Sequence, residues 1–497
     1  FLVDNNLSFP LFVLSTISFI LFIVKQFKSF SLKSIKDLPP SPPKLPIIGN
    51  LHQVGSKPHI SFANIAKEYG PLIYVRLGNQ PVVIASTPET AMEILKTQDR
   101  FLCSRDVPNA FKQPSLLPHS LIWSECNQTW KKLRTLCRTE MFSTKALEAQ
   151  SILREEKIGH MLDFLHSKQG EVTNIEDVVF TTLFNTLSSI IFAKDLIDLT
   201  DDYGSSDELK ATLHKIIEFG GRVIDFGSFF PNLERFDLHG IRKGTMKHFL
   251  KAFSYWEYII EERRSQVNSS TWSSNQAQTF VDRLLENGFS NNQIHQLVME
   301  LFVAGTNTTT STVVWVMSEL VRHQGVMFKI EDEMKKEIQS DKINPTHIFK
   351  LSYLQACIKE TMRLHPPVPL LLPHMAAETC EVKGYTIPKN TKNTKVFVNL
   401  WAMGRDPKVW DDPLSFKPER FMGSKMDFKG QDFELLPFGS GRRMCPGLPS
   451  GMKSVELILA SLIHEFNWSL PDAGDPSTLD MNSKFGIAMK RENPLKL

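Results

Sequence analysis

An uncharged apolar run near the N-terminus constrains the fold of this chain more than any other feature. Leu7 to Val24 comprises eighteen residues without a charged side chain. At about 1.5 Å per residue, a helix of this length roughly spans the hydrocarbon core of a bilayer. A cleaved signal peptide and a buried core helix are the alternatives, but the run exceeds an ordinary signal segment and no small-residue cleavage site follows. We therefore expect a single-pass transmembrane anchor.

The residues after this run indicate its orientation and the start of a globular body. Asp4 precedes the run, and the basic residues Lys25, Lys28, Lys33 and Lys36 follow it. The positive-inside rule then places most of the chain in the cytoplasm. Five prolines in residues 37–50 favour extended polyproline geometry, as in a stiff hinge or an ordinary spacer. We expect an anchor with its basic flank at 1–36, a hinge at 37–50 and one domain at 51–497.

Composition excludes several classes of protein. The chain has 497 residues, of which 42% are hydrophobic, so it can bury a large core. A formal net charge of +3 gives no reason to expect nucleic acid as a partner. The six cysteines are scattered and none forms a CxxC pair, which argues against a disulfide scaffold and a structural zinc site.

Periodicity predicts a mainly α-helical domain with small β-sheets. Alternating apolar patterns predict strands at 72–77, 82–84, 381–387 and 394–399. Helical patterns cover 152–166, 246–266, 292–323 and 325–338. The aromatic, proline-broken segment 226–236 is interpreted as a loop able to touch lipid or ligand, and 268–276 as an exposed loop.

The string PFGSGRRMCPG at residues 437–447 concentrates chemistry around one cysteine. Cys445 follows a glycine-containing turn and precedes an apolar helical run at 452–462. A thiolate there would accept bonds from backbone N–H groups and feel the positive end of a helix. Gly441 permits a tight turn, Gly447 allows close approach of a flat ligand, and Arg443 can pair with a carboxylate. A lone cysteine is usually structural, but the complete string is far more specific.

The spacing Phe438-x-x-Gly441-x-Arg443-x-Cys445-x-Gly447 resembles the haem-binding signature of the cytochrome P450 family. The resemblance implies the P450 fold, with haem b as cofactor. It implies that Cys445 is the axial thiolate ligand of the iron and that Arg443 reaches a haem propionate. Thiolate ligation favours cleavage of the O–O bond.

Three further strings support this resemblance. Glu360 and Arg363 lie one helical turn apart, and the string FKPERF contributes Arg420. Alone, such a pair is a routine surface ion pair; in the family, the three residues form a buried ion-pair triad. Trp130 and Arg134, in the string WKKLR, resemble the residues that contact haem propionates, with Lys131 where the family usually has Arg.

A fourth string, AGTNTT at residues 304–309, resembles the oxygen-activation segment of the family. Gly305 leaves room for a planar cofactor, and Thr308 takes the place of the hydroxyl that hydrogen-bonds iron-bound oxygen. Asn307 departs from the usual acid, and an amide does not readily transfer protons. We hypothesise that water or Thr308 carries the proton relay, or that the reaction needs fewer delivered protons. The alternative is a helix whose hydroxyls bond its own backbone.

The resemblance also places a substrate pocket and partners. Its implied pocket residues are Phe302, Ala304, Val368, Leu370, Leu371 and Phe485, although each could be ordinary core. His374 replaces an arginine that usually approaches a propionate, and either haem contact or neutral packing suits it. Electrons would come from NADPH through NADPH-cytochrome P450 reductase. The reductase would dock on a basic face of this chain formed by Lys131, Lys132, Arg442 and Lys453, unless these are merely solvated surface charges.

The strings KPHISFANIAKEYGPL, ILKTQDRFLCSR and LFNTLSSIIFAKDL resemble the alkaloid-biosynthesis branch of plant microsomal P450s. That branch includes N-methylcoclaurine hydroxylases, corytuberine synthase and littorine mutase. The expected protein is an endoplasmic reticulum membrane monooxygenase that hydroxylates, couples or rearranges a small apolar alkaloid. A terpenoid or phenylpropanoid hydroxylase is the alternative, and a haem protein that binds ligand without turnover is the non-enzymatic one.

Overall fold

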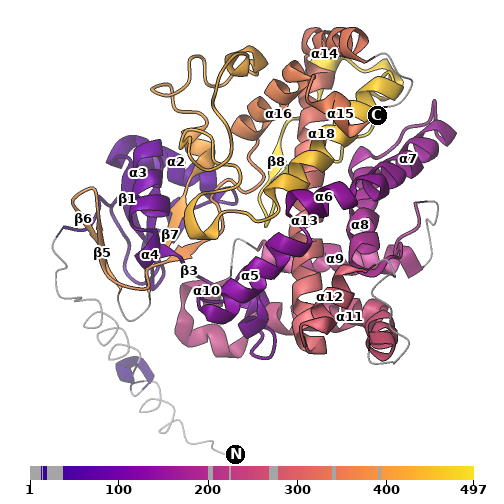
Figure 1. Ribbon diagram of the computed structural model, residues 1–497. Coiled ribbons are helices and arrows are strands. Elements are labelled where there is room, and N and C mark those ends of the chain that lie inside the picture. Colours follow the sequence, from indigo (N-terminus) through magenta and orange to yellow (C-terminus); the bar gives the residue numbers. More distant parts are fainter. Residues whose placement is uncertain are drawn as a thin grey trace, which may run out of the picture.

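The computed structural model describes residues 37–199, 205–222, 225–267, 278–338, 343–389 and 393–497, together with 13 and 15–18. The predicted transmembrane run, its basic flank and the predicted loop 268–276 therefore lie wholly or mostly outside the described residues. Figure 1 shows most of the strands, together with α2, α3 and α4, on one side of the molecule and the long helices on the other.

The helices make up most of the domain. They are α2 (Pro58–Tyr69), α3 (Pro88–Met92), α4 (Asp99–Leu102), α5 (Gln128–Glu140), α6 (Thr144–Ala149), α7 (Ser151–Ser167), α8 (Ile175–Phe192), α9 (Ser205–Gly220), α10 (Phe226–Phe229), α11 (Ile241–Val267), α12 (Phe280–Glu286), α13 (Asn291–Arg322), α14 (Gln324–Glu337), α15 (Pro345–Ile348), α16 (Ser352–Leu364), α17 (Leu400–Met403) and α18 (Leu448–Glu465). The predicted helices at 152–166, 246–266, 292–323 and 325–338 are confirmed as α7, α11, α13 and α14.

The strands form one mixed sheet and two small hairpins. They are β1 (Leu72–Leu77), β2 (Gln80–Ala85), β3 (Ser104–Arg105), β4 (His374–Met375), β5 (Cys380–Val382), β6 (Tyr385–Ile387), β7 (Lys395–Val398), β8 (Ser483–Lys484) and β9 (Lys490–Arg491). The five-stranded sheet has the order β1-β2-β7-β4-β3, in which β2 and β7 are parallel. The mainly α architecture with small sheets is as predicted.

The long helix α13 runs through the core and carries one wall of the site. A reciprocal capping box starts it, because Ser290 and Gln293 exchange hydrogen bonds at the first turn. It packs against α8, α16 and α18. Val313 to Val321 is buried without interruption, so the C-terminal half of α13 is a structural axis of the domain.

The proline segment before the domain is tied to the sheet. The N–H of Tyr74 in β1 donates to the carbonyl of Pro40 at 2.8 Å. At the C-terminal end of the segment, the side-chain amide of Asn50 donates to the Pro43 carbonyl at 3.1 Å. The backbone N–H of Asn50 donates to the Arg76 carbonyl at 2.6 Å. The proline segment therefore lies against β1.

Two expectations change in detail. The segment 226–236, predicted as a loop, consists of α10 followed by a 3-10 helix at Pro231–Phe236. Phe226 and Phe236 remain exposed there. Among the described residues, α8 is the one helix long and apolar enough to cross a membrane, and 78% of it is buried inside the protein. The apolar character of α8 is thus explained by its place in the core.

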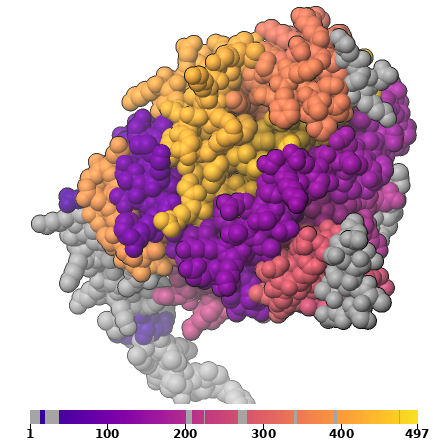
Figure 2. Space-filling model, in the orientation of Figure 1, coloured from indigo at the N-terminus to yellow at the C-terminus, as the bar shows by residue number. Residues whose placement is uncertain are grey.

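Segments far apart in the sequence meet in the molecule. On the face shown in Figure 2, the yellow C-terminal segment lies between the indigo N-terminal part and the purple helices that follow it. The C-terminus lies near α15 and α18 in Figure 1. This arrangement brings the loop before α18 next to α5 and the strand β3, where the candidate site is built.

Candidate active site

Cys445 ends a tightly turned loop that precedes α18. Gly439 and Gly441 have φ angles of 68° and 70°, in the left-handed region that favours glycine. A Cβ on Gly441 would lie 2.0 Å from the backbone oxygen of Leu95, so this turn also needs glycine for space. The N–H of Cys445 donates to the Phe438 carbonyl at 2.9 Å. These constraints fix the sulfur just ahead of the first turn of α18.

The sulfur of Cys445 is exposed only in the sense that it faces an internal cavity. Burial raises the pKa of the Cys445 thiol above its ordinary value, and the backbone N–H groups of Gly447 and Leu448 and the charge of Arg134 oppose only part of that shift. The lowering interactions all favour ionised sulfur, which is the form that binds soft transition metals. The loop therefore presents one thiol to the cavity, and coordination to a metal ion would deprotonate it.

The cavity in front of Cys445 has a volume of about 310 Å³ and is lined mainly by apolar side chains. Its walls come from α8, from α13, and from segments 121–123, 367–372, 437–455 and 487–488. Val368 and Leu371 lie in the wall as expected. A cavity of this size and composition is typical of a site for a small apolar molecule.

Four predicted residues of α13 also lie in the wall: Ala304, Gly305, Asn307 and Thr308. The Thr308 hydroxyl donates to the Ala304 carbonyl at 2.8 Å. The Asn307 amide donates to the Val303 carbonyl at 3.2 Å, while its Oδ1 is buried without a hydrogen-bond partner. The polar tract is therefore back-bonded to its own helix, and it also faces the cavity.

Gly305 serves helix packing as well as the cavity. A Cβ on Gly305 would lie 2.9 Å from the side chain of Leu187 on α8. Such a contact is closer than real Cβ atoms make, so Leu187 would have to move. The absence of a side chain at Gly305 thus lets α13 approach α8.

Two predicted arginines line the cavity and are held from behind by Trp130. Arg443 donates to the carbonyls of Cys103 at 2.9 Å and Ser124 at 2.5 Å. Arg134 donates to the Met444 carbonyl at 2.5 Å. Both guanidinium groups lie over the Trp130 ring, at 4.7 Å and 5.3 Å from its centroid. Trp130 itself is outside the cavity wall, so it supports the arginines and does not face a ligand.

His374 and Arg105 complete this side of the cavity. They are paired opposite each other on β4 and β3. His374 is buried, bonds the Leu102 carbonyl through Nδ1 at 2.8 Å, and has its pKa held well below the usual value by burial. Arg105 donates to the Leu372 carbonyl at 2.6 Å, and its Nε is buried without a partner. His374 therefore contributes a neutral ring, and Arg105 supplies positive charge.

The residues present fit haem. Arg105, Arg134 and Arg443 all line the cavity that holds the Cys445 sulfur. Their hydrogen bonds in the described part of the chain go to backbone carbonyls rather than to acidic side chains. A ligand with a metal for the sulfur and two carboxylates for the guanidinium groups would satisfy both demands.

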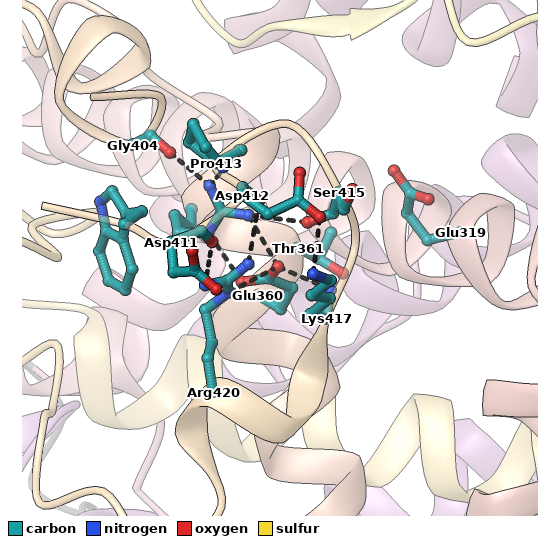
Figure 3. A network of polar contacts seen from close by, with 12 residues as sticks. Glu319, Glu360, Thr361, Gly404, Asp411, Asp412, Pro413, Ser415, Lys417 and Arg420 are labelled. Carbon is teal, nitrogen blue, oxygen red and sulfur yellow. Dashed lines mark hydrogen bonds and ion pairs between the residues drawn. The ribbon is translucent and has the colours of Figure 1, made fainter. Parts of the chain in front are cut away.

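The predicted ion-pair triad is present behind the site. Glu360 binds Arg363 through two bonds of 2.7 Å and Arg420 at 3.1 Å. It also accepts the backbone N–H of Lys417 at 2.8 Å. Figure 3 labels Glu360, Arg420 and Lys417 together with Gly404, Asp411, Asp412, Pro413 and Ser415, whose carbonyls receive the remaining guanidinium bonds. The triad ties α16, whose Met362 lines the cavity, to the segment 411–420.

Three predicted pocket residues do not line the cavity. Phe302 is buried against Phe184, with ring centroids 4.3 Å apart, because it lies about 200° around α13 from Ala304. Leu370 packs in the core beside the sheet. Phe485 stacks on His59 at 5.4 Å. Neighbouring residues take their places in the wall, namely Leu301, Val303, Leu372, Ile487 and Ala488.

Two charged wall residues were missed by sequence reasoning. Glu300 lies on the same ridge of α13 as Ala304 and Thr308, since residues four apart share a helical face. The spacing of four residues from Thr308 to Ala304 and on to Glu300 is the sequence signal for this position. Arg105 had no such signal, because its position depends on the pairing of β3 with β4 across the whole chain.

The comparisons with known proteins agree with this geometry. The family description Cytochrome P450 matches residues 39–496. An (S)-N-methylcoclaurine 3'-hydroxylase of Papaver somniferum is 44% identical over 90% of this chain and 92% of the relative. Corytuberine synthase of Coptis japonica is 41% identical over 89% of this chain and 90% of the relative.

A solved structure supports the fold independently. A zebra fish cytochrome P450, determined with progesterone, aligns with a TM-score of 0.74, at 21% identity, over 88% of this chain and 98% of its own. Members of this family are haem b monooxygenases that use NADPH-derived electrons, act on small molecules and depend on a reductase partner. The family match spans the proline segment from residue 39, the helix α13 and the Cys445 loop. By family match and by sequence identity to its relatives, the chain belongs to the cytochrome P450 family.

Proposed function

We propose that this P450 oxidises a plant alkaloid at haem b held by Cys445. The observation that carries the proposal is that the Cys445 sulfur and Thr308 face the same mainly apolar cavity. The relatives named for N-methylcoclaurine and corytuberine support the alkaloid class. The reaction is a hydroxylation, a phenol coupling or a rearrangement.

The side chains divide the work of this site. Haem, when bound, supplies oxygen activation that the protein tunes and orients. Cys445 would ligate its iron, Arg134 and Arg443 would hold its propionates, and Arg105 would add charge on the same side. Val368 and Leu371 exclude water and position an apolar substrate.

Proton delivery rests on Thr308 and water. Asn307 offers the cavity an amide, and its Nδ2 is engaged by the Val303 carbonyl. The Thr308 hydroxyl can both accept and donate a proton, and its present acceptor, the Ala304 carbonyl, is one turn away on the same helix. Water therefore brings the proton to Thr308 Oγ1, and no carboxylic acid at position 307 takes part.

We also propose the placement of the protein in the cell. An anchor at 1–36 would hold the chain in the endoplasmic reticulum membrane, and the hinge at 37–50 would position the catalytic domain 51–497 on the cytoplasmic side. NADPH-cytochrome P450 reductase would dock on Lys131, Lys132, Arg442 and Lys453. The first three are exposed, and Arg442 pairs with Asp99 at 2.5 Å.

A microsomal assay tests the proposal. The full chain is expressed with reductase, supplied with NADPH and offered panels of alkaloids, terpenoids and phenylpropanoids, with products read by mass spectrometry. We expect an alkaloid product that has gained one oxygen, lost two hydrogens or isomerised. Turnover of terpenoids or phenylpropanoids alone would contradict the alkaloid assignment, and absence of any product would favour a binding protein.

A further inference from the structure

A carboxylate lies on the cavity wall two turns before Thr308. Glu300, Ala304 and Thr308 are spaced by four on α13, and all three line the cavity together with Gln296, one turn earlier. Eight residues at 1.5 Å each separate Glu300 from Thr308 by about 12 Å along the helix. Glu300 is the one acidic side chain of this wall in the described part of the chain.

The hydrogen-bond partners of this carboxylate are neutral. The Glu300 carboxylate accepts bonds from the Ser120 hydroxyl, from the Gln296 amide at 2.9 Å, and from the backbone N–H groups of Leu121 at 2.7 Å and Ile122 at 3.3 Å. Backbone N–H donors hold an anion without neutralising it. The carboxyl group is thus held at the wall by neutral donors and lacks a cationic partner among these contacts.

Burial makes this charge responsive to a cation. It raises the pKa of Glu300 to about 7, although hydrogen bonds from Ser120, Gln296 and the loop oppose the shift. Cys137 on α5 and Arg443 from the Cys445 loop are the other ionisable groups that feel this carboxyl. Because Arg443 is assigned to a haem propionate, it is not counted as the ion-pair partner of Glu300. A positive charge on the substrate could take that place.

Aromatic rings line the same cavity as the carboxylate. Phe111 and Trp123 both line the cavity and stack on each other with centroids 5.4 Å apart. The N–H of Trp123 donates at 2.7 Å to the same Ser120 hydroxyl that binds Glu300. Phe249 lies beside Phe111 at 6.3 Å. An acid together with aromatic faces is the combination that recognises an organic ammonium group.

We propose that Glu300, with Phe111 and Trp123, forms a subsite for the protonated amine of the substrate. The inference rests on the proposed function, which it deepens by naming the group that is recognised. An amine held at Glu300 leaves the rest of a two-ring ligand to extend along α13 toward Ala304 and Thr308. Glu300 is then a specificity residue that selects cations and sets which end of the substrate is oxidised.

The alternative is a purely structural role, in which Glu300 only pins the loop at 120–122. The two roles differ in their dependence on ligand charge. Loss of the pinned loop would weaken every ligand alike, whereas loss of the amine subsite would weaken cations selectively. Binding of ligands matched in shape but not in charge therefore separates them.

The experiment measures ligand-induced difference spectra of the full chain in microsomes. The probes are N-methylcoclaurine, a tertiary amine; its quaternary N,N-dimethyl analogue, which is cationic at every pH; and the neutral N-acetyl analogue of coclaurine. A second pair, N,N-dimethyl-4-phenylbutylamine and its neutral carbon isostere, contains no alkaloid. Each variant is first matched for haem content by its carbon monoxide difference spectrum.

We expect Glu300→Gln to weaken both cationic coclaurine ligands by roughly tenfold or more and the neutral analogue by less than about twofold. Gln296→Glu places a carboxylate one turn away, but beside an intact Glu300 the two carboxyl groups would share a proton, so this change is tested in place of Glu300. In the Glu300→Gln background it should restore part of their affinity and change the ratio of oxidised products.

Equal weakening of cationic and neutral ligands by Glu300→Gln would overturn the inference. So would unchanged binding of the cations by both variants. If Glu300→Gln does not fold, the charge preference of the double variant Glu300→Gln, Gln296→Glu decides, because it keeps one carboxylate and moves it by one turn. If no coclaurine ligand binds the wild type but the phenylbutylamine pair shows the charge preference, the proposed substrate class fails and the amine subsite stands.

Discussion

The Glu360→Gln substitution tests the triad that supports the site, and its cost follows from the contacts. Glu360 and Arg363 have fully buried side chains, and Arg420 is 12% exposed. The substitution keeps the size of the side chain but leaves two buried cations without their anion. Removing one partner of a buried pair costs about 3–5 kcal/mol. Arg363 retains carbonyl acceptors at Gly404, Pro413 and Ser415, so the lower end of that range applies.

The corresponding shift in melting temperature is measurable. Unfolding entropy of about 2.1 cal/mol/K per residue gives roughly 1 kcal/mol/K for a chain of this length. A loss of about 3 kcal/mol then lowers the midpoint by about 3 °C. Thermal unfolding is followed by circular dichroism and, in parallel, by the carbon monoxide spectrum of the remaining haem protein.

A matched control keeps this result interpretable. Asp332 pairs with Lys336 at 2.5 Å on the surface of α14, with side chains 47% and 69% exposed. Exposed pairs of this kind contribute at most about 0.5 kcal/mol, so Asp332→Asn should move the midpoint by less than about 1 °C. If Glu360→Gln melts with the same midpoint as Asp332→Asn, the reasoning about the triad is wrong.

Three further predictions concern proton delivery, acid stability and electron transfer. Thr308→Ala should divert electrons from product to hydrogen peroxide, whereas Thr308→Ser should largely keep the wild-type product-to-peroxide ratio. Asn307→Asp should change that ratio. Unchanged ratios for both positions would contradict the relay through water and Thr308. Burial raises the pKa of Glu319, but hydrogen bonds from two histidines lower that pKa overall from 4.5 to about 2. Ionised Glu319 therefore contributes stability above about pH 4.5, and this contribution is lost as the pH falls toward 2. Glu319→Gln should flatten the acid-denaturation profile in that window. Added salt should slow reductase-supported turnover, and a Lys131→Glu, Lys132→Glu variant should lose most of that salt dependence; equal salt dependence of variant and wild type would argue against docking on this face.

Sequence reasoning succeeded where a local pattern determines a local structure. The turn with Gly441 and Cys445 is encoded within eleven residues, and β1 and α14 follow directly from their periodicity. The resemblance to the family placed Glu360 with Arg420, which are bonded in the structure. Each of these features depends on residues whose motif fixes their spacing.

The sequence predictions failed where the direction of a side chain depends on structure beyond the local pattern. The resemblance to the family placed Phe302 in the pocket, but the turn of the helix directs it toward α8. Leu370 precedes two residues that do line the cavity, and the irregular backbone at Leu371, with φ of 50°, hides which side chain points inward. Phe485 lies two residues before Ile487, which does line the cavity. Arg105 reaches the site only through strand pairing between distant segments, which no single-sequence pattern contains.

The most direct test of the account is the spectrum of the Cys445→Ala variant. Purified wild-type protein, reduced and exposed to carbon monoxide, should show the long-wavelength Soret band that thiolate ligation gives to haem. The variant, matched for fold by circular dichroism, should lose that band and most of its bound haem. A variant that keeps both the haem content and the thiolate band of the wild type would contradict the assignment of Cys445 as the iron ligand.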